Sequence, residues 1–130
     1  MERWLGRYSE VCYALLRLVA GFLFACHGAQ KLFGALGAEG RQTAPLMLTA
    51  GVIEFFGGVL VAIGLAAGWA AFIASGQMAA AYFMAHAPNS FWPILNHGEL
   101  AVLYCFVFLF IASRGSGRFS VEAMLKRGRP

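Results

Sequence analysis

The chain has 130 residues, of which 60% are apolar and only 12% are charged, and its formal net charge is +4. An ordinary soluble domain is about 25% charged, so this composition excludes a typical soluble enzyme and indicates a membrane protein. At about 20 residues per span, the length permits at most four membrane crossings and leaves no room for a separate soluble catalytic domain.

Four apolar segments predict four helices within a single domain, residues 1–130. In chain order they cover about residues 10–32, 45–65, 69–86 and 97–113. A continuous helix over residues 44–87 would be about 66 Å long, roughly twice the thickness of a bilayer's hydrocarbon core. The chain must therefore turn back near residues 64–68, where glycines flank a short apolar stretch. After the fourth helix comes a basic tail, residues 114–130, in which Ser120 is expected to cap a short amphipathic helix.

The placement of the basic residues predicts the topology. Seven of them lie before the first apolar segment or after the last one: Arg3, Arg7, Arg114, Arg118, Lys126, Arg127 and Arg129. The turns at residues 64–69 and 87–96 carry neither lysine nor arginine. Under the positive-inside rule both termini lie in the cytoplasm, which requires an even number of spans. We therefore predict an all-α, four-transmembrane-helix bundle whose basic tail meets anionic lipid, and no nucleic-acid binding, because no basic patch on a folded face is evident.

Small residues predict how the first two helices meet. Glycines recur seven residues apart on each helix, at Gly21 and Gly28 and at Gly51 and Gly58. Helices inside lipid associate where small residues let their backbones approach, so we expect these two stripes to face one another. Each stripe also carries a charge, which places Arg17 opposite Glu54. A lone charge at the bilayer centre costs about 2.5–3.5 kcal/mol, so the two should form an ion pair.

Two interpretations of that expected ion pair remain open. In the first, it is structural and fixes the register of the two helices. In the second, Glu54 is a catalytic carboxylate that takes up and releases protons during turnover.

A second polar cluster is expected at the outer helix ends. Its members are His27 and Lys31 on the first helix, His86 on the third, and His97 and Glu99 on the fourth. They could line a pocket for an organic ligand such as a quinone, ligate a metal, or only cap helix ends. The spacing does not support a metal site, because His97 and Glu99 are two residues apart and fall on different faces of a helix. Gln77 and His86, nine residues apart, are likewise expected on opposite sides of the third helix.

Four short motifs carry a resemblance to a known family. They are H-G-A-Q-K-L-F-G at residues 27–34, G-V-I-E-F-F-G-G-V-L at 51–60, N-H-G-E-L-A at 96–101 and G-R-F-S at 117–120. In this order, the set resembles the DoxX family of small bacterial membrane proteins. The resemblance implies a four-helix bundle in the bacterial plasma (inner) membrane and a link to redox biology. Relatives include a membrane subunit of thiosulfate–quinone oxidoreductase and proteins that assemble with oxidative-stress enzymes.

Two functions are compatible with this resemblance. The chain could be a quinone-linked redox subunit, in which His27, His86 and His97 bind the quinone carbonyls and Glu54 or Glu99 exchanges protons. Electrons would then come from a partner protein, because the sequence has no haem-attachment motif, iron–sulfur cysteine set or nucleotide fingerprint. Alternatively, it could be a membrane assembly or scaffolding factor without catalytic activity. Either function predicts a protein partner or a homo-oligomer.

Overall fold

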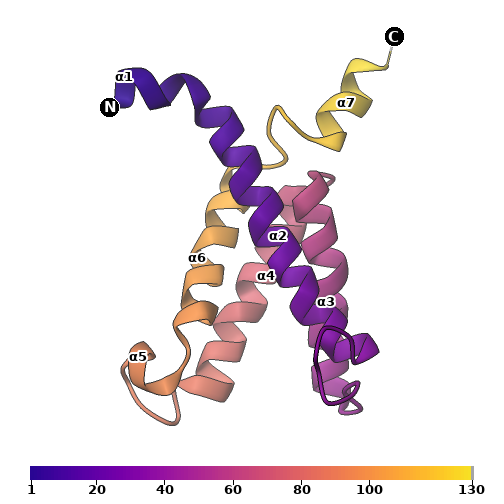
Figure 1. Cartoon of the computed structure of the whole chain (residues 1–130), viewed down its shortest axis with the longest axis vertical. Coiled ribbons are helices and arrows are strands. Elements are labelled where there is room, and N and C mark those ends of the chain that lie inside the picture. The colour runs from indigo at the N-terminus through magenta and orange to yellow at the C-terminus, as the bar shows by residue number, and fades with distance from the viewer. Residues whose placement is uncertain (130) are drawn as a thin grey trace.

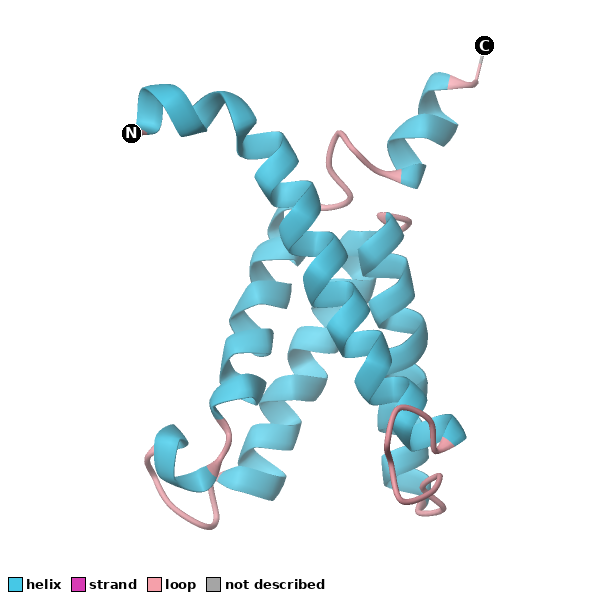
Figure 2. Cartoon of the chain, viewed as in Figure 1, coloured by secondary structure: helices cyan, strands magenta, loops and turns pink. Residues whose placement is uncertain are grey.

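The computed structural model describes residues 1–129 as helices joined by short loops, with no β-strand among them (Figure 2). The main helices are α2 (Ser9–Phe33), α3 (Pro45–Ile63), α4 (Ala67–Ala81) and α6 (Glu99–Arg114). Shorter elements are α1 (Glu2–Leu5), the 3₁₀ turn η1 (Gly6–Tyr8), the π-helical turn η2 (Tyr82–His86), α5 (Pro93–Asn96) and α7 (Val121–Arg127). The all-α prediction is confirmed, and the four predicted helices correspond to α2, α3, α4 with η2, and α6.

The main helices form two pairs. Helix α2 packs along α3, helix α4 packs along α6, and contacts between α3 and α4 join the pairs. The backbones of α2 and α6 come close at few points, and the two helices meet mainly through side chains such as Phe24 and Tyr104. The two pairs cross near the end that carries both termini and diverge toward the end that carries α5 (Figure 1). This divergence matters because the cavity described below lies between the pairs.

Close backbone contact at glycines joins α2 to α3. A Cβ atom on Gly28 would lie 2.2 Å from the backbone nitrogen of Phe55, and one on Gly21 would lie 2.5 Å from the carbonyl oxygen of Gly58. No side chain larger than hydrogen fits at these two positions without moving a helix. The predicted facing of the two glycine stripes is therefore confirmed.

The predicted Arg17–Glu54 ion pair is wrong, because the antiparallel packing of α2 and α3 places the two side chains at different positions along the helix axes. Arg17, near the start of α2, lies at the far end of α3, where a Cβ on Gly64 would be 2.7 Å from its Cζ. Ten residues separate that point from Glu54, or about 15 Å along a helix. Arg17 instead donates hydrogen bonds to the carbonyl oxygens of Ser116 and Phe119. It therefore holds the segment that follows α6 against α2.

The same segment is fixed to the α3–α4 turn through Glu122. The backbone amide of Glu122 donates to the carbonyl oxygen of Gly64 at 3.0 Å. Its carboxylate accepts a hydrogen bond from the Ser116 hydroxyl and lies 2.9 Å from the Lys126 Nζ. The hydrogen bonds from Ser116 and then Lys126 hold the pKa of Glu122 below its ordinary value, so the group stays ionised to lower pH than an ordinary glutamate. Ser120 caps the start of α7 with its side chain, as predicted.

The exterior of the bundle is strongly apolar. Phe22, Phe72 and Phe106, on three different helices, are each at least 60% exposed. Soluble proteins rarely expose large apolar patches of this kind. Two helical segments, Glu2–Phe33 and Pro45–Ile63, are long and apolar enough to cross a membrane. These outer faces are therefore suited to contact with lipid acyl chains.

We expect Gly28→Ala to destabilise the protein, because the new Cβ collides with the backbone of α3 and forces the helices apart. Overpacking of this kind costs about 1–3 kcal/mol. Thermal unfolding in detergent micelles, followed by circular dichroism, measures the loss. Gly57→Ala is the matched control, because a Cβ there meets nothing within 4 Å. Equal stability of the two variants would contradict the close approach of α2 and α3.

Candidate ligand-binding site

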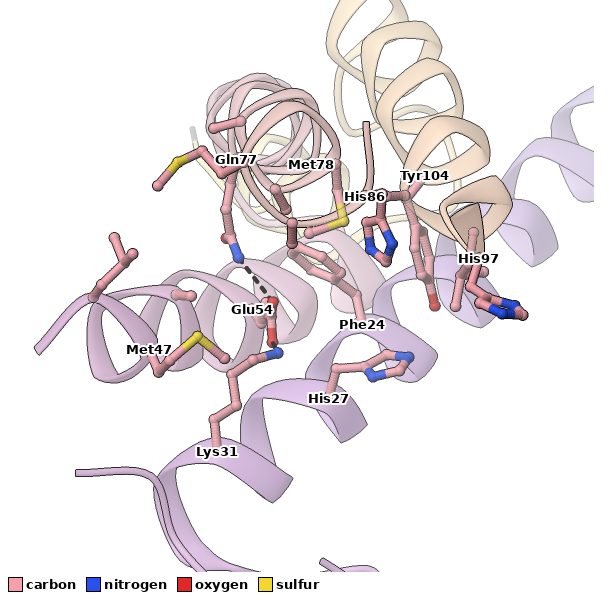
Figure 3. Close-up of a pocket in the computed structure, with 18 residues that line it drawn as sticks. Phe24, His27, Lys31, Met47, Glu54, Gln77, Met78, His86, His97 and Tyr104 are labelled. Carbon is pink, nitrogen blue, oxygen red and sulfur yellow. Dashed lines mark hydrogen bonds and ion pairs between the residues drawn. The ribbon is translucent and has the colours of Figure 1, made fainter. Parts of the chain in front are cut away.

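A cavity of about 430 Å³ lies between the two helix pairs, at the end where they diverge. Its walls are mostly alanine, methionine, leucine and phenylalanine side chains. The polar groups that line it are His27, Lys31, Glu54, Gln77, His86, His97 and Tyr104 (Figure 3). All four main helices or their ends contribute. The structure thus brings together every predicted residue of the outer cluster except Glu99, and adds Glu54.

Glu54 is the most deeply buried charged group of the cavity, with only 3% of its surface exposed. Its Oε2 atom lies 2.5 Å from the Nζ of Lys31 on α2. Its Oε1 atom accepts a hydrogen bond of 2.8 Å from the Nε2 of Gln77 on α4 (Figure 3). A carboxylate withdrawn from water needs such partners to remain charged. Lys31, rather than Arg17, is therefore the counter-ion of Glu54, and the network ties three helices together.

The local sequence explains how Lys31 reaches α3. His27 and Lys31 are four residues apart on α2, so they lie on the same face one turn from each other. Gly51 is nearly one turn before Glu54 on α3, and a Cβ there would lie 3.0 Å from the Cβ of Lys31. The missing side chain at Gly51 therefore gives the Lys31 stem room to cross α3 and pair with Glu54.

The π-helical turn η2 brings His86 to the cavity. In this turn the amide of Ala87 donates to the carbonyl oxygen of Tyr82 at 2.9 Å, a bond across five residues instead of four. The wider turn changes the angle between side chains, so Gln77 and His86 both line the cavity. The expectation that they lie on opposite sides of the helix is wrong for this reason. The His86 Nδ1 is 3.0 Å from the carbonyl oxygen of Asn96.

The N-H-G sequence before α6 forms a tight turn that presents His97. Asn96 is buried, donates from Nδ2 to the carbonyl oxygen of Ser90 at 2.9 Å, and accepts at Oδ1 from the amide of Gly98 at 2.8 Å. His97 between them has the left-handed φ of +60°, which is uncommon for a residue with a side chain. Its exposed imidazole lies at the rim of the cavity. Glu99, in the first turn of α6, is exposed and does not line the cavity.

Sequence reasoning missed Tyr104, although a signal for it was present. Tyr104 follows His97 by seven residues, so both fall on one face of the predicted fourth helix, residues 97–113, although α6 itself begins at Glu99. The tyrosine is 6% exposed, and its ring centroid lies 5.4 Å from that of Phe24 and 6.3 Å, edge-on, from that of His27. Its ring forms part of the cavity wall (Figure 3). Sequence reasoning also did not place Gln77 in the candidate site, although it is the only amide side chain in α4.

The arrangement suits an uncharged organic ligand with polar atoms at its head. Its volume falls in the range of small-molecule sites, about 300–1,000 Å³, and such sites combine apolar walls with a few convergent polar groups. Imidazole and ammonium groups can donate hydrogen bonds or exchange protons. Within residues 1–129, no three His, Cys, Asp or Glu side chains are grouped so that they could hold a metal ion.

An all-helical chain with an apolar exterior and a polar network inside is a helical membrane protein. A sequence profile of the DoxX family matches residues 12–87, and this chain belongs to that family. The matched region includes His27, Lys31, Glu54, Gln77 and His86.

The chain is also similar to a protein of Haemophilus influenzae that is described only as uncharacterized. The two are 39% identical over 125 residues, which cover 91% of this chain and 93% of that protein. No solved structure matches the chain.

The ion pair predicts non-additive effects on stability. Lys31→Met leaves the buried carboxylate of Glu54 without its counter-charge, which typically costs about 3–5 kcal/mol. Glu54→Leu leaves the partly exposed Lys31 without its partner, at a smaller cost. The double variant leaves no orphaned charge, so it should recover much of that loss. Unfolding free energies of the four proteins, measured in mixed micelles with increasing SDS, form the double-mutant cycle. Purely additive losses would show that the two side chains do not interact.

Proposed function

We propose that this protein is a quinone-linked membrane subunit that works with a partner protein and holds the quinone headgroup in the cavity. The observation that carries the proposal is the joining of three imidazoles with the Lys31–Glu54–Gln77 network, centred on the buried Glu54, in one apolar cavity. The network and the imidazoles come from separate stretches of the chain, and a merely structural ion pair would not require a cavity beside it.

The donor set matches the chemistry of a quinone headgroup. Quinone carbonyl oxygens only accept hydrogen bonds, and the N–H groups of His27, His97 and Lys31 can donate to them. The apolar walls suit the faces of the ring. Phe24 and Met78 line the cavity, and aromatic and thioether groups make favourable contacts with a flat ring.

Reduction of a quinone to a quinol consumes two electrons and two protons. The imidazoles and Lys31 can deliver protons to the carbonyl oxygens, and His97 at the exposed rim can be reprotonated from water. In the opposite direction, Glu54 and the imidazoles can accept the protons. The electrons come from the partner protein, because the sequence has no motif for a redox group of its own. The residues of this chain thus bind the quinone and move protons.

The proposed topology is four spans with both termini in the cytoplasm of a bacterial cell. Both termini lie at the same end of the structure (Figure 1). That end carries the seven basic residues of the terminal segments, whereas the opposite loop after α2 contributes only Arg41. Helix α4 with η2 has 20 residues, which is enough for about 30 Å of bilayer. The cavity then lies toward the outer face of the inner membrane.

Labelling of single cysteines tests this topology. In a background without the three native cysteines, we expect Glu39→Cys and Asn89→Cys to react with a membrane-impermeant maleimide in intact spheroplasts. Arg127→Cys should react only after the membrane is permeabilised, because it lies on the basic side. The reverse pattern, or labelling of all three, would contradict the four-span orientation.

Binding of a soluble, tailless benzoquinone tests the function. We expect the purified protein in nanodiscs to bind it, and His27→Phe and Lys31→Met to weaken binding about tenfold or more, the effect of losing one hydrogen bond in a buried site. Isothermal titration calorimetry measures the affinity, and Cys12→Ser, exposed and away from the cavity, is the control.

Co-purification of partner proteins separates the two functions. A quinone subunit should keep its partner when His27→Phe abolishes quinone binding. A wild-type protein that binds no quinone, together with a His27→Phe variant that loses its partner, would overturn the proposal in favour of an assembly role.

A further inference from the structure

We infer that the cavity opens sideways into the bilayer through a slot between α3 and the α4–η2 helix, so that its ligand carries a long hydrophobic tail and arrives from within the membrane. This inference rests on the proposed function, and it adds the route of access and the class of ligand.

The inner end of the slot is the hydrogen bond between Glu54 and Gln77. This contact sets the antiparallel register of α3 and α4. One helical turn from it, toward the end that carries α5, Ala50 on α3 lies opposite Ala81 on α4. Ala80 is next to Ala81 and is exposed, and all three alanines line the cavity. Methyl side chains on both helices leave more room between α3 and α4 than larger residues would.

The outer end of the slot is made by long, flexible apolar side chains. Met47 on α3 and Met84 in η2 both line the cavity. Met84 is 63% exposed, and the neighbouring Leu46 is 62% exposed. Side chains that line the cavity and are also exposed form the part of its wall that lies nearest the outer surface. This rim has no polar group, so it is suited to acyl chains rather than to water.

The other exposed edge of the cavity has a different character. It lies at the turn between α5 and α6, where His97 and Leu100 are exposed. An imidazole at a helix end, next to a loop, is suited to exchange protons with water. The cavity therefore has one polar edge near the loops and one apolar edge between helices.

A ligand with a long tail needs an exit from a cavity of this size. About 430 Å³ holds a substituted ring but not a long isoprenoid chain in addition. A headgroup held near Lys31 and Glu54 would lie at the inner end of the slot, and its tail could follow the row of alanines out between the two methionines. The geometry therefore points to a membrane-dissolved isoprenoid quinone rather than a water-soluble one.

A tryptophan that fills the slot tests this route. We expect Ala80→Trp to weaken binding of a long-chain isoprenoid quinone at least tenfold, while a tailless benzoquinone with the same ring binds within about twofold of wild type. Native mass spectrometry from nanodiscs measures the first, and titration calorimetry measures the second. Met84→Trp makes the same test at the outer end of the slot, if Ala80→Trp does not fold.

Ile73→Trp is the matched control. Ile73 is exposed, lies seven residues before Ala80 and so on the same face of α4, and does not line the cavity. Its substitution should leave both affinities unchanged. The inference is overturned, and the proposed function left standing, if the tailed quinone binds the slot variants as tightly as it binds wild type. The same holds if Leu100→Trp, rather than the slot variants, prevents binding of the tailed quinone. Failure of the wild-type protein to bind even the tailless quinone would overturn both.

Discussion

The rest of the structure depends on the buried carboxylate of Glu54. An ionised carboxylate in an apolar interior is tolerated only with a counter-charge and hydrogen bonds, and Glu54 obtains them from Lys31 on α2 and Gln77 on α4. These partners come from different helices, so the requirement of one side chain fixes the relative position of three. The same contacts lie in the wall of the cavity, which couples the architecture of the bundle to its candidate site.

The two ends of the bundle differ in how closely the helices are held together. At the end with the termini, Arg17 and Glu122 hold the segment after α6 against α2 and the α3–α4 turn. At the other end the helix pairs diverge, and the polar side chains point into the space between them (Figure 3). Fixing one end firmly allows the other to stay open without loss of the fold, which is a suitable arrangement for a site that admits a ligand.

Two departures from regular helical geometry lie at the cavity. The π-helical turn carries His86, and the left-handed residue of the N-H-G turn is His97. Both imidazoles would point elsewhere in an uninterrupted helix. Irregular backbone of this kind persists where neighbouring groups fix it, as the buried Asn96 does here, and it is often found at functional sites.

The sequence by itself determined the helices, the facing glycine stripes and the residues of the outer cluster, because hydropathy, glycine spacing and side-chain chemistry are local properties. It could not determine that Lys31 rather than Arg17 pairs with Glu54, since that depends on the antiparallel register of α2 and α3. Nor could it place Gln77 and His86 in one cavity, because the π-helical turn interrupts the regular α-helical periodicity that would put them on opposite sides. Only the tertiary structure decided which polar residues share a site, because helical periodicity specifies a face and not the neighbour that packs against it.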